Sequence, residues 1–146
     1  MRLIKNLGAA LVLAAGLLAA PAAHAIAFEE ADAGIYAVLD KDGKVTKFAY
    51  RFYVQNGKWV AEQRGLDAVW SPIKCDKDCE IRPIPEADLP RYVPGLDQIT
   101  PGCLRNSQFS VCKYLYKKDP ATPRFMTVLG TPQGAVVLFM SFLAPM

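Results

Sequence analysis

The sequence predicts a mainly β domain, an antiparallel meander of about seven strands that curls into a small barrel or sandwich. Two hairpin signals, Asp42-Gly43 and Asn56-Gly57, favour this class, because such pairs adopt the left-handed backbone of tight turns. The third observation is the segment 83–101, whose five prolines exclude a long helix.

Short apolar or alternating runs between turn residues predict the individual strands. The run 44–55 is the clearest, because Phe48, Tyr50 and Phe52 recur at every second position and share one face, which Val54 continues. We expect that face to line the core. The predicted strands are 34–40, 44–55, 58–64, 67–75, 108–117, 124–130 and 135–143, with a brief continuation at 80–82. The run 135–143 is almost wholly apolar, which is typical of a buried strand.

The proline-rich segment 83–101 is predicted to be a long, rigid excursion over the surface. A central strand is not expected there, because proline cannot donate to a strand ladder. The segment holds at most one short helix near 86–93, since Pro90 restricts the residues before it.

Residues 1–25 have the pattern of a cleavable secretory signal peptide. Two cations, Arg2 and Lys5, precede an apolar run, and Ala23-His24-Ala25 supplies the small residues that signal peptidase accepts. A membrane anchor is the alternative, but the apolar run is shorter than the ~20 residues of a spanning helix. Cleavage leaves 26–146 as a single disulfide-bonded domain of 121 residues, expected in the periplasm or secreted.

The expected mature chain is nearly neutral and has no histidine. Without Arg2 and Lys5 it keeps 15 of the 17 basic residues against 14 acidic ones, so a nucleic-acid partner is not expected. The single histidine, His24, lies in the signal peptide. A Ser-His or Cys-His nucleophile, an imidazole base and a histidine ligand for a metal or haem are therefore excluded. We predict a protein that is not an enzyme and uses no cofactor.

The four cysteines, Cys75, Cys79, Cys103 and Cys112, all lie in the mature part. Four thiolates also suit zinc, but the C-x-x-C knuckles of such sites are absent here. An even number of cysteines in a short exported chain favours two disulfides. Three pairings exist, and we favour the local one, 75–79 and 103–112, because a polar turn lies between the partners in each case.

Two pairs of arginine and tyrosine are candidate interface residues. Arg51 and Tyr53 have the opposite parity to the aromatic face of 44–55, so they are expected to point outward. Arg91 and Tyr92 lie in the proline-stiffened segment, and such stiffening lowers the entropy cost of binding. Tyrosine and arginine are enriched among the residues that dominate protein–protein binding energies.

Together these features favour an exported, non-catalytic binding protein, most simply an inhibitor or immunity protein that neutralises an enzyme or toxin acting in the cell envelope. The alternative is a small β-barrel that carries an apolar or envelope ligand, with Phe48 and Phe52 facing its cavity. A carboxylate-based hydrolase ranks third, because the 14 acidic residues offer many pairs and none stands out.

Overall fold

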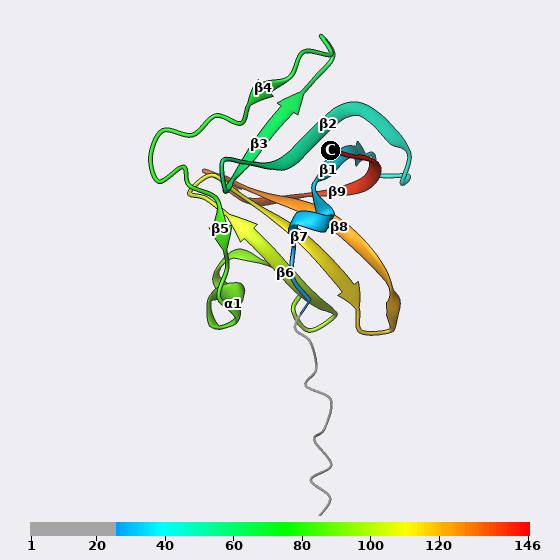
Figure 1. Cartoon of the computed structure of the whole chain (residues 1–146). Helices are drawn as coiled ribbons and strands as arrows, with labels where there is room; N and C mark the ends of the chain where they lie inside the picture. The colour runs from blue at the N-terminus through cyan, green and yellow to red at the C-terminus, as the bar shows by residue number, and fades with distance from the viewer. Residues whose placement is uncertain (1–25) are drawn as a thin grey trace, which may run out of the picture.

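Nine antiparallel strands form one sheet that curls into a half-barrel (Figure 1). The computed structural model describes residues 26–146, so the expected signal peptide, residues 1–25, lies outside the described residues. The strands are β1 (Gly34–Leu39), β2 (Val45–Gln55), β3 (Lys58–Arg64), β4 (Ser71–Pro72), β5 (Arg82–Pro83), β6 (Ile99–Arg105), β7 (Phe109–Tyr116), β8 (Asp119–Thr131) and β9 (Gly134–Pro145). Their order across the sheet is β4-β3-β2-β1-β9-β8-β7-β6-β5. The predicted mainly β, antiparallel fold is confirmed.

Both predicted hairpins are present. Between β2 and β3, Asn56 and Gly57 have positive φ angles of 53° and 73°, which the tight turn requires. Between β1 and β2, Gly43 has a φ of 76°, and the Asp40 carboxylate accepts the backbone N–H of Lys44 at 2.9 Å. Local turn chemistry therefore sets the register of the first three strands.

The predicted strand 67–75 is wrong in length, because only β4 pairs with β3 there. Ala68 adopts the left-handed conformation, with a φ of 57°, and the Asp67 carboxylate accepts the N–H of Val69 at 3.3 Å. The chain therefore turns at these residues and cannot extend along β3.

The proline-rich segment ends earlier than expected, because β6 already begins at Ile99. Pro101 thus lies inside a strand, contrary to the prediction. Since β5 pairs only with Leu104 and Arg105, β6 is an edge strand at Pro101, where a sheet tolerates proline. The expected short helix is present as η2 (Glu86–Asp88) followed by α1 (Leu89–Tyr92). Within residues 26–146, no helix is long and apolar enough to cross a membrane.

The inner face of the half-barrel is filled by an aromatic core. Phe28, in the segment that precedes β1, is 5% exposed. Its ring centroid lies 5.5 Å from that of Trp59 and 6.0 Å from that of Phe52. Further buried members of this core are Tyr36, Val38, Tyr50, Ala61, Leu104, Phe109, Val111 and Met140.

The segment 26–33, with the 3-10 turn η1 (Glu30–Asp32), lies across this inner face. An ion pair to β7 and a close backbone approach to β6 define its position. The Lys113 ammonium on β7 lies 3.0 Å from the carboxylate of Asp32. On β6, a Cβ at Gly102 would come within 2.0 Å of the carbonyl oxygen of Ile26. The close approach of this segment to β6 therefore requires glycine at that position.

A second core lies on the other face of the sheet, over β6 to β9. The proline-rich segment covers this outer face with the buried side chains of Ile84, Leu89 and Val93. Cys103 and Cys112 belong to the same cluster. The sheet is consequently buried on both faces from β6 to β8.

Phe48 is not a core residue, contrary to the prediction. Its side chain is 50% exposed, whereas Phe52 on the same strand is 1% exposed. The reason is its position, because the pairing of β3 with β2 ends at Ala49 and Phe48 lies past the end of that ladder, outside the inner core.

The last strand is also less buried than predicted. Met140 is buried in the inner core, but Phe139 and Leu143 are each nearly half exposed. On the outer face, Val137 is the residue of β9 that packs against the outer core, so the remainder of that face is uncovered.

Candidate binding surface

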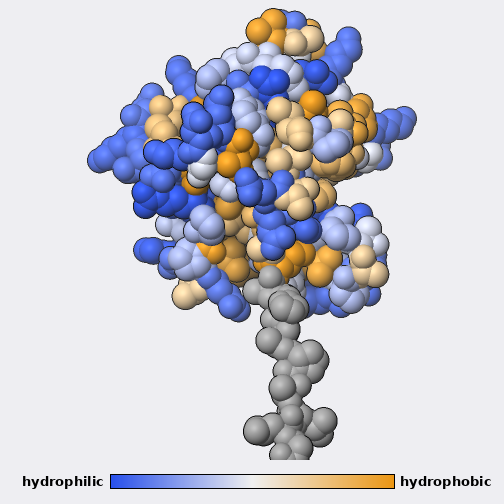
Figure 2. Space-filling view, viewed as in Figure 1, coloured by the Kyte–Doolittle hydropathy of each residue, from blue (hydrophilic) through white to orange (hydrophobic). Residues whose placement is uncertain are grey.

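The segment that joins β4 to β5, residues 73–81, is here called the strap. Because β4 and β5 are the two end strands of the sheet order, the strap connects opposite edges of the half-barrel. Ile73 and Ile81, at its two ends, pack against the inner core. The surface over the strap, at the left in Figure 2, is largely hydrophilic.

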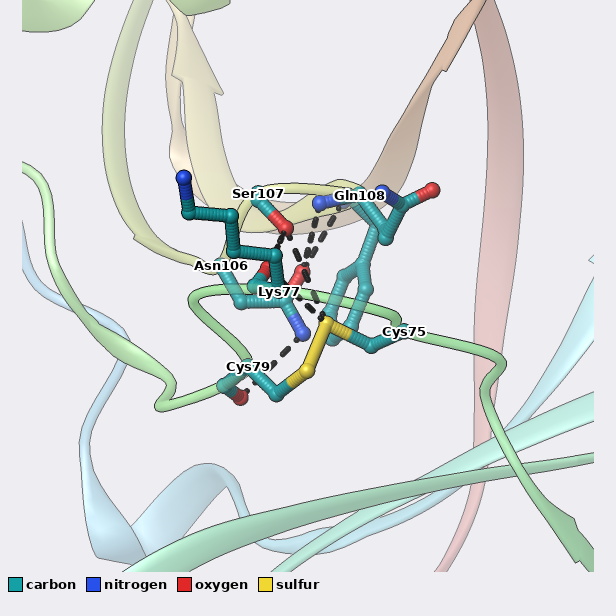
Figure 3. Close-up of a disulfide and its surroundings, with 7 residues drawn as sticks. Cys75, Lys77, Cys79, Asn106, Ser107 and Gln108 are labelled. Atoms are coloured by element: carbon teal, nitrogen blue, oxygen red, sulfur yellow. Dashed lines mark hydrogen bonds between the residues drawn. A yellow bond between two sulfur atoms is a disulfide. The ribbon is translucent and has the colours of Figure 1, made fainter.

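A disulfide closes a short loop within the strap, and hydrogen bonds hold that loop against the β6–β7 turn (Figure 3). Cys75 and Cys79 are bonded to each other, with a Cα–Cα distance of 5.7 Å. The backbone N–H of Ser107 donates to the carbonyl of Asp78 at 3.1 Å. The Asn106 amide donates to the carbonyl of Cys79 at 3.4 Å. The strap is therefore fixed at its middle as well as at its ends.

The second disulfide joins β6 to β7. Cys103 and Cys112 are directly opposite each other in the ladder and are both buried in the outer core. The structure thus has the local pairing that the sequence favoured. Two disulfides are compatible with an oxidising compartment.

The candidate pair Arg91 and Tyr92 lies in α1, beside the β6–β7 turn. Arg91 is exposed, whereas Tyr92 is half-buried and packs against the outer core. The guanidinium carbon of Arg105, at the end of β6, lies 3.7 Å from the centroid of the Tyr92 ring. Tyr92 therefore presents its ring to a cation of the same chain.

Two grooves flank the stack of Tyr92 and Arg105. The larger one, about 660 Å³, runs toward the strap and is lined by two arginines and three acidic residues. The smaller one, about 220 Å³, lies between α1 and the β6–β7 turn, and we call it the arginine groove. Its charged lining residues are Arg91 and Arg105, with no acidic residue.

In the larger groove, one of the two arginines is neutralised. Arg82 forms an ion pair with Glu80, and both side chains are largely exposed. The hydrogen bond from Arg82 lowers the pKa of the Glu80 carboxyl, which keeps this acid charged. Within residues 26–146, neither Arg91 nor Arg105 has an acidic partner within 4 Å.

The other candidate pair, Arg51 and Tyr53, is used within the protein itself. Arg51 forms an ion pair with Glu62 on β3, and the Tyr53 hydroxyl donates to the same carboxylate at 3.2 Å. The guanidinium of Arg51 also lies 4.6 Å from the ring centroid of Trp70. This pair belongs to the β2–β3 half of the sheet and does not join Arg91 and Tyr92 in one surface.

Arg105 is the member of this surface that the sequence interpretation missed. Its position near the end of a strand, two residues after Cys103, gives no hint of a partner, because its contact with Tyr92 joins positions thirteen residues apart across the proline-rich segment. The alternation of side chains along β6 carries one signal. Cys103 and Arg105 are two residues apart, so in a strand both side chains lie on the same face of the sheet.

The described residues contain no group of three or more metal-ligating side chains. Comparisons with family models, curated proteins and solved structures found no match. The geometry of the surface is therefore the basis for any functional assignment.

Proposed function

We propose that this chain is an exported, non-catalytic binding protein of the periplasm that inhibits or neutralises an envelope-acting enzyme or toxin. The observation that carries the proposal is the surface formed by Arg91, Tyr92 and Arg105. It combines two cations that lack acidic partners among the described residues with an aromatic ring. Arginine and tyrosine are typical of the residues that dominate protein interfaces.

The frame of this surface is rigid, which favours binding. The strap disulfide and the hydrogen bonds of the strap fix one side, and the second disulfide joins β6 to β7, the two strands on either side of the turn. The prolines on either side of η2 and α1 restrict the backbone that carries Tyr92. A pre-ordered surface loses less conformational entropy when a partner binds.

The carrier alternative receives less support from the same structure. A carrier barrel needs an internal cavity, but here the inner face is occupied by Phe28 and the segment 26–33. Phe48, expected to face such a cavity, is exposed. The grooves beside Tyr92 and Arg105 are open to the surface, so a protein partner suits them better than an enclosed ligand.

The proposal is tested by identifying the partner and measuring its affinity. The protein is expressed with its native residues 1–25 and captured from periplasmic extract, and each co-purified protein is then produced separately. A specific partner should bind the purified protein and lose its own activity in the complex. Failure to find a partner that is inhibited, or turnover of an envelope polymer by the purified protein, would contradict the proposal.

The exposed Arg91 gives the cleanest variant for that measurement. Arg91→Ala should weaken the complex roughly thirtyfold if it is a hot spot worth ~2 kcal/mol. Arg124→Ala is the matched control, because Arg124 also lies near a tyrosine ring, Tyr116, but on another part of the sheet. Tyr92→Ala is unsuitable on its own, since Tyr92 also packs against the outer core.

A further inference from the structure

The position of Arg105 is set by stacking and not by an ion pair. Its guanidinium carbon lies 3.7 Å from the centroid of the Tyr92 ring, the closest of the cation–ring contacts in this structure. Its Nε atom is buried and has no hydrogen-bond partner among the described residues. The guanidinium is therefore held in place while no carboxylate of the described residues lies within 4 Å of it.

On the side of the arginine groove, the charged residues around Arg105 are cations and not carboxylates. Arg82 lies directly opposite Arg105 on β5, but Glu80 already neutralises it. Arg91 lines the arginine groove together with Arg105. On β7, the residue opposite Arg105 is Ser110, which also lines the groove. An anion that enters this groove meets two guanidinium groups and no carboxylate.

The size and the remaining lining of the groove narrow the choice of anion. About 220 Å³ is less than the space that drug-sized ligands occupy, so a side chain fits better than a nucleotide. Tyr92, Val128 and Ala135 supply apolar surface beside the two arginines. A short apolar stem that ends in a carboxylate matches this combination, and arginine binds carboxylates with paired, charge-assisted hydrogen bonds.

We infer that the arginine groove binds an aspartate or glutamate side chain of the partner protein, with Arg105 as the principal donor and Arg91 as the second cation. This inference rests on the proposed function for the existence of a partner. The carboxylate approaches the two Nη groups of Arg105, because Nε is buried. Tyr92 is a positioning residue that holds the guanidinium at the wall of the groove.

The chemistry of the groove is tested without the partner by ¹⁵N NMR of the arginine guanidinium groups, read at the Nη atoms that the carboxylate would contact. The Arg105 signal is assigned by its absence from the spectrum of Arg105→Lys. The probe is an acetylated, amidated tetraglutamate peptide, and the tetraglutamine peptide is its neutral control. A saturable shift of the Arg105 signal with tetraglutamate alone is expected. No shift, an equal shift with tetraglutamine, or an equal shift with inorganic phosphate would overturn the inference.

The second arm uses the purified complex. Arg105→Gln should weaken the complex about ten- to hundredfold, the range for a hydrogen bond to a charged group. Arg105→Lys should lie between the wild type and Arg105→Gln, because lysine keeps the charge but not the planar fork. Arg124→Gln, far from the groove, should bind like the wild type.

The outcomes separate the inference from the proposed function. If Arg105→Gln binds the partner as tightly as the wild type, the carboxylate site is wrong although the binding function stands. If Arg105→Gln unfolds more easily, Arg91→Gln gives the same test, because Arg91 is exposed. Unchanged affinity in Arg91→Gln would then overturn the inference. Absence of any inhibited partner contradicts the proposed function, while the peptide titration still decides the chemistry of the groove.

Discussion

Replacing Phe28 with alanine removes a ring at the centre of the inner core. Phe28 is 5% exposed, and its ring lies within about 6 Å of four others, those of Tyr36, Phe52, Trp59 and Phe125. Burial of this degree places Phe28→Ala in the class of core substitutions that cost about 3–5 kcal/mol. That is a large share of the 5–15 kcal/mol typical of a folded domain. For a chain of this size the melting temperature should fall by roughly 10–20 °C.

Urea unfolding followed by tryptophan fluorescence measures the loss, because Trp59 packs directly against Phe28. Phe48→Ala is the matched control. It removes the same side chain from a position that is 50% exposed, so its cost should stay below about 1 kcal/mol. Equal losses in the two variants would refute the assignment of Phe28 to the core and with it the view that the segment 26–33 fills the half-barrel.

The same reasoning gives further expectations. Gly102→Ala should destabilise the fold in thermal melts because its Cβ meets the backbone of Ile26 at 2.0 Å, whereas Gly130→Ala, with its nearest neighbour 4.0 Å away, should be nearly neutral. Alanine at both cysteines of the β6–β7 disulfide should cost about 3 kcal/mol, and the same change in the strap about 2 kcal/mol because the closed loop is shorter, provided that urea titrations show two-state unfolding. Burial raises the pKa of Tyr36, so the contribution of this group to the free energy of unfolding should be fully present below the usual tyrosine pKa of about 10 and be lost above it, and Tyr36→Phe should weaken that alkaline loss. Intact-mass measurement of the exported protein should give a chain that starts at Ile26 and carries four hydrogens fewer than the reduced sequence, and thiols that alkylate without reduction would contradict the disulfides.

The local features of the fold could be predicted from the sequence because their causes are local. Asn56-Gly57 sets a tight turn through its own backbone preferences, and the strands on either side follow from alternation. Prolines on either side of η2 and α1 limit the helix to the short turn that is observed. Each of these signals depends on residues close in the chain.

The features that were missed depend on residues far apart in the chain. Nothing near Phe28 in the sequence predicts that it enters the core, because the strands that it packs against lie far from it in the chain. Phe48 alternates perfectly with Tyr50, yet β3 ends before reaching it. The stack of Arg105 on Tyr92 requires the return of the chain after the proline-rich segment. Alternation along the sequence predicts on which face of a strand a side chain lies, but not whether other residues bury that face.

The arrangement of the two cores explains why the candidate surface lies where it does. The inner face is occupied by the segment 26–33, and the outer face of β6 to β8 is covered by the proline-rich segment, so neither of these two surfaces is free for a partner. The end of β6 and the turn that follows it lie at the margin of the covered region, beside the strap. There Arg105 lies two residues after Cys103 and one before Asn106, which holds the strap. One disulfide therefore fixes the strand that carries the principal cation, and the other fixes the wall beside it.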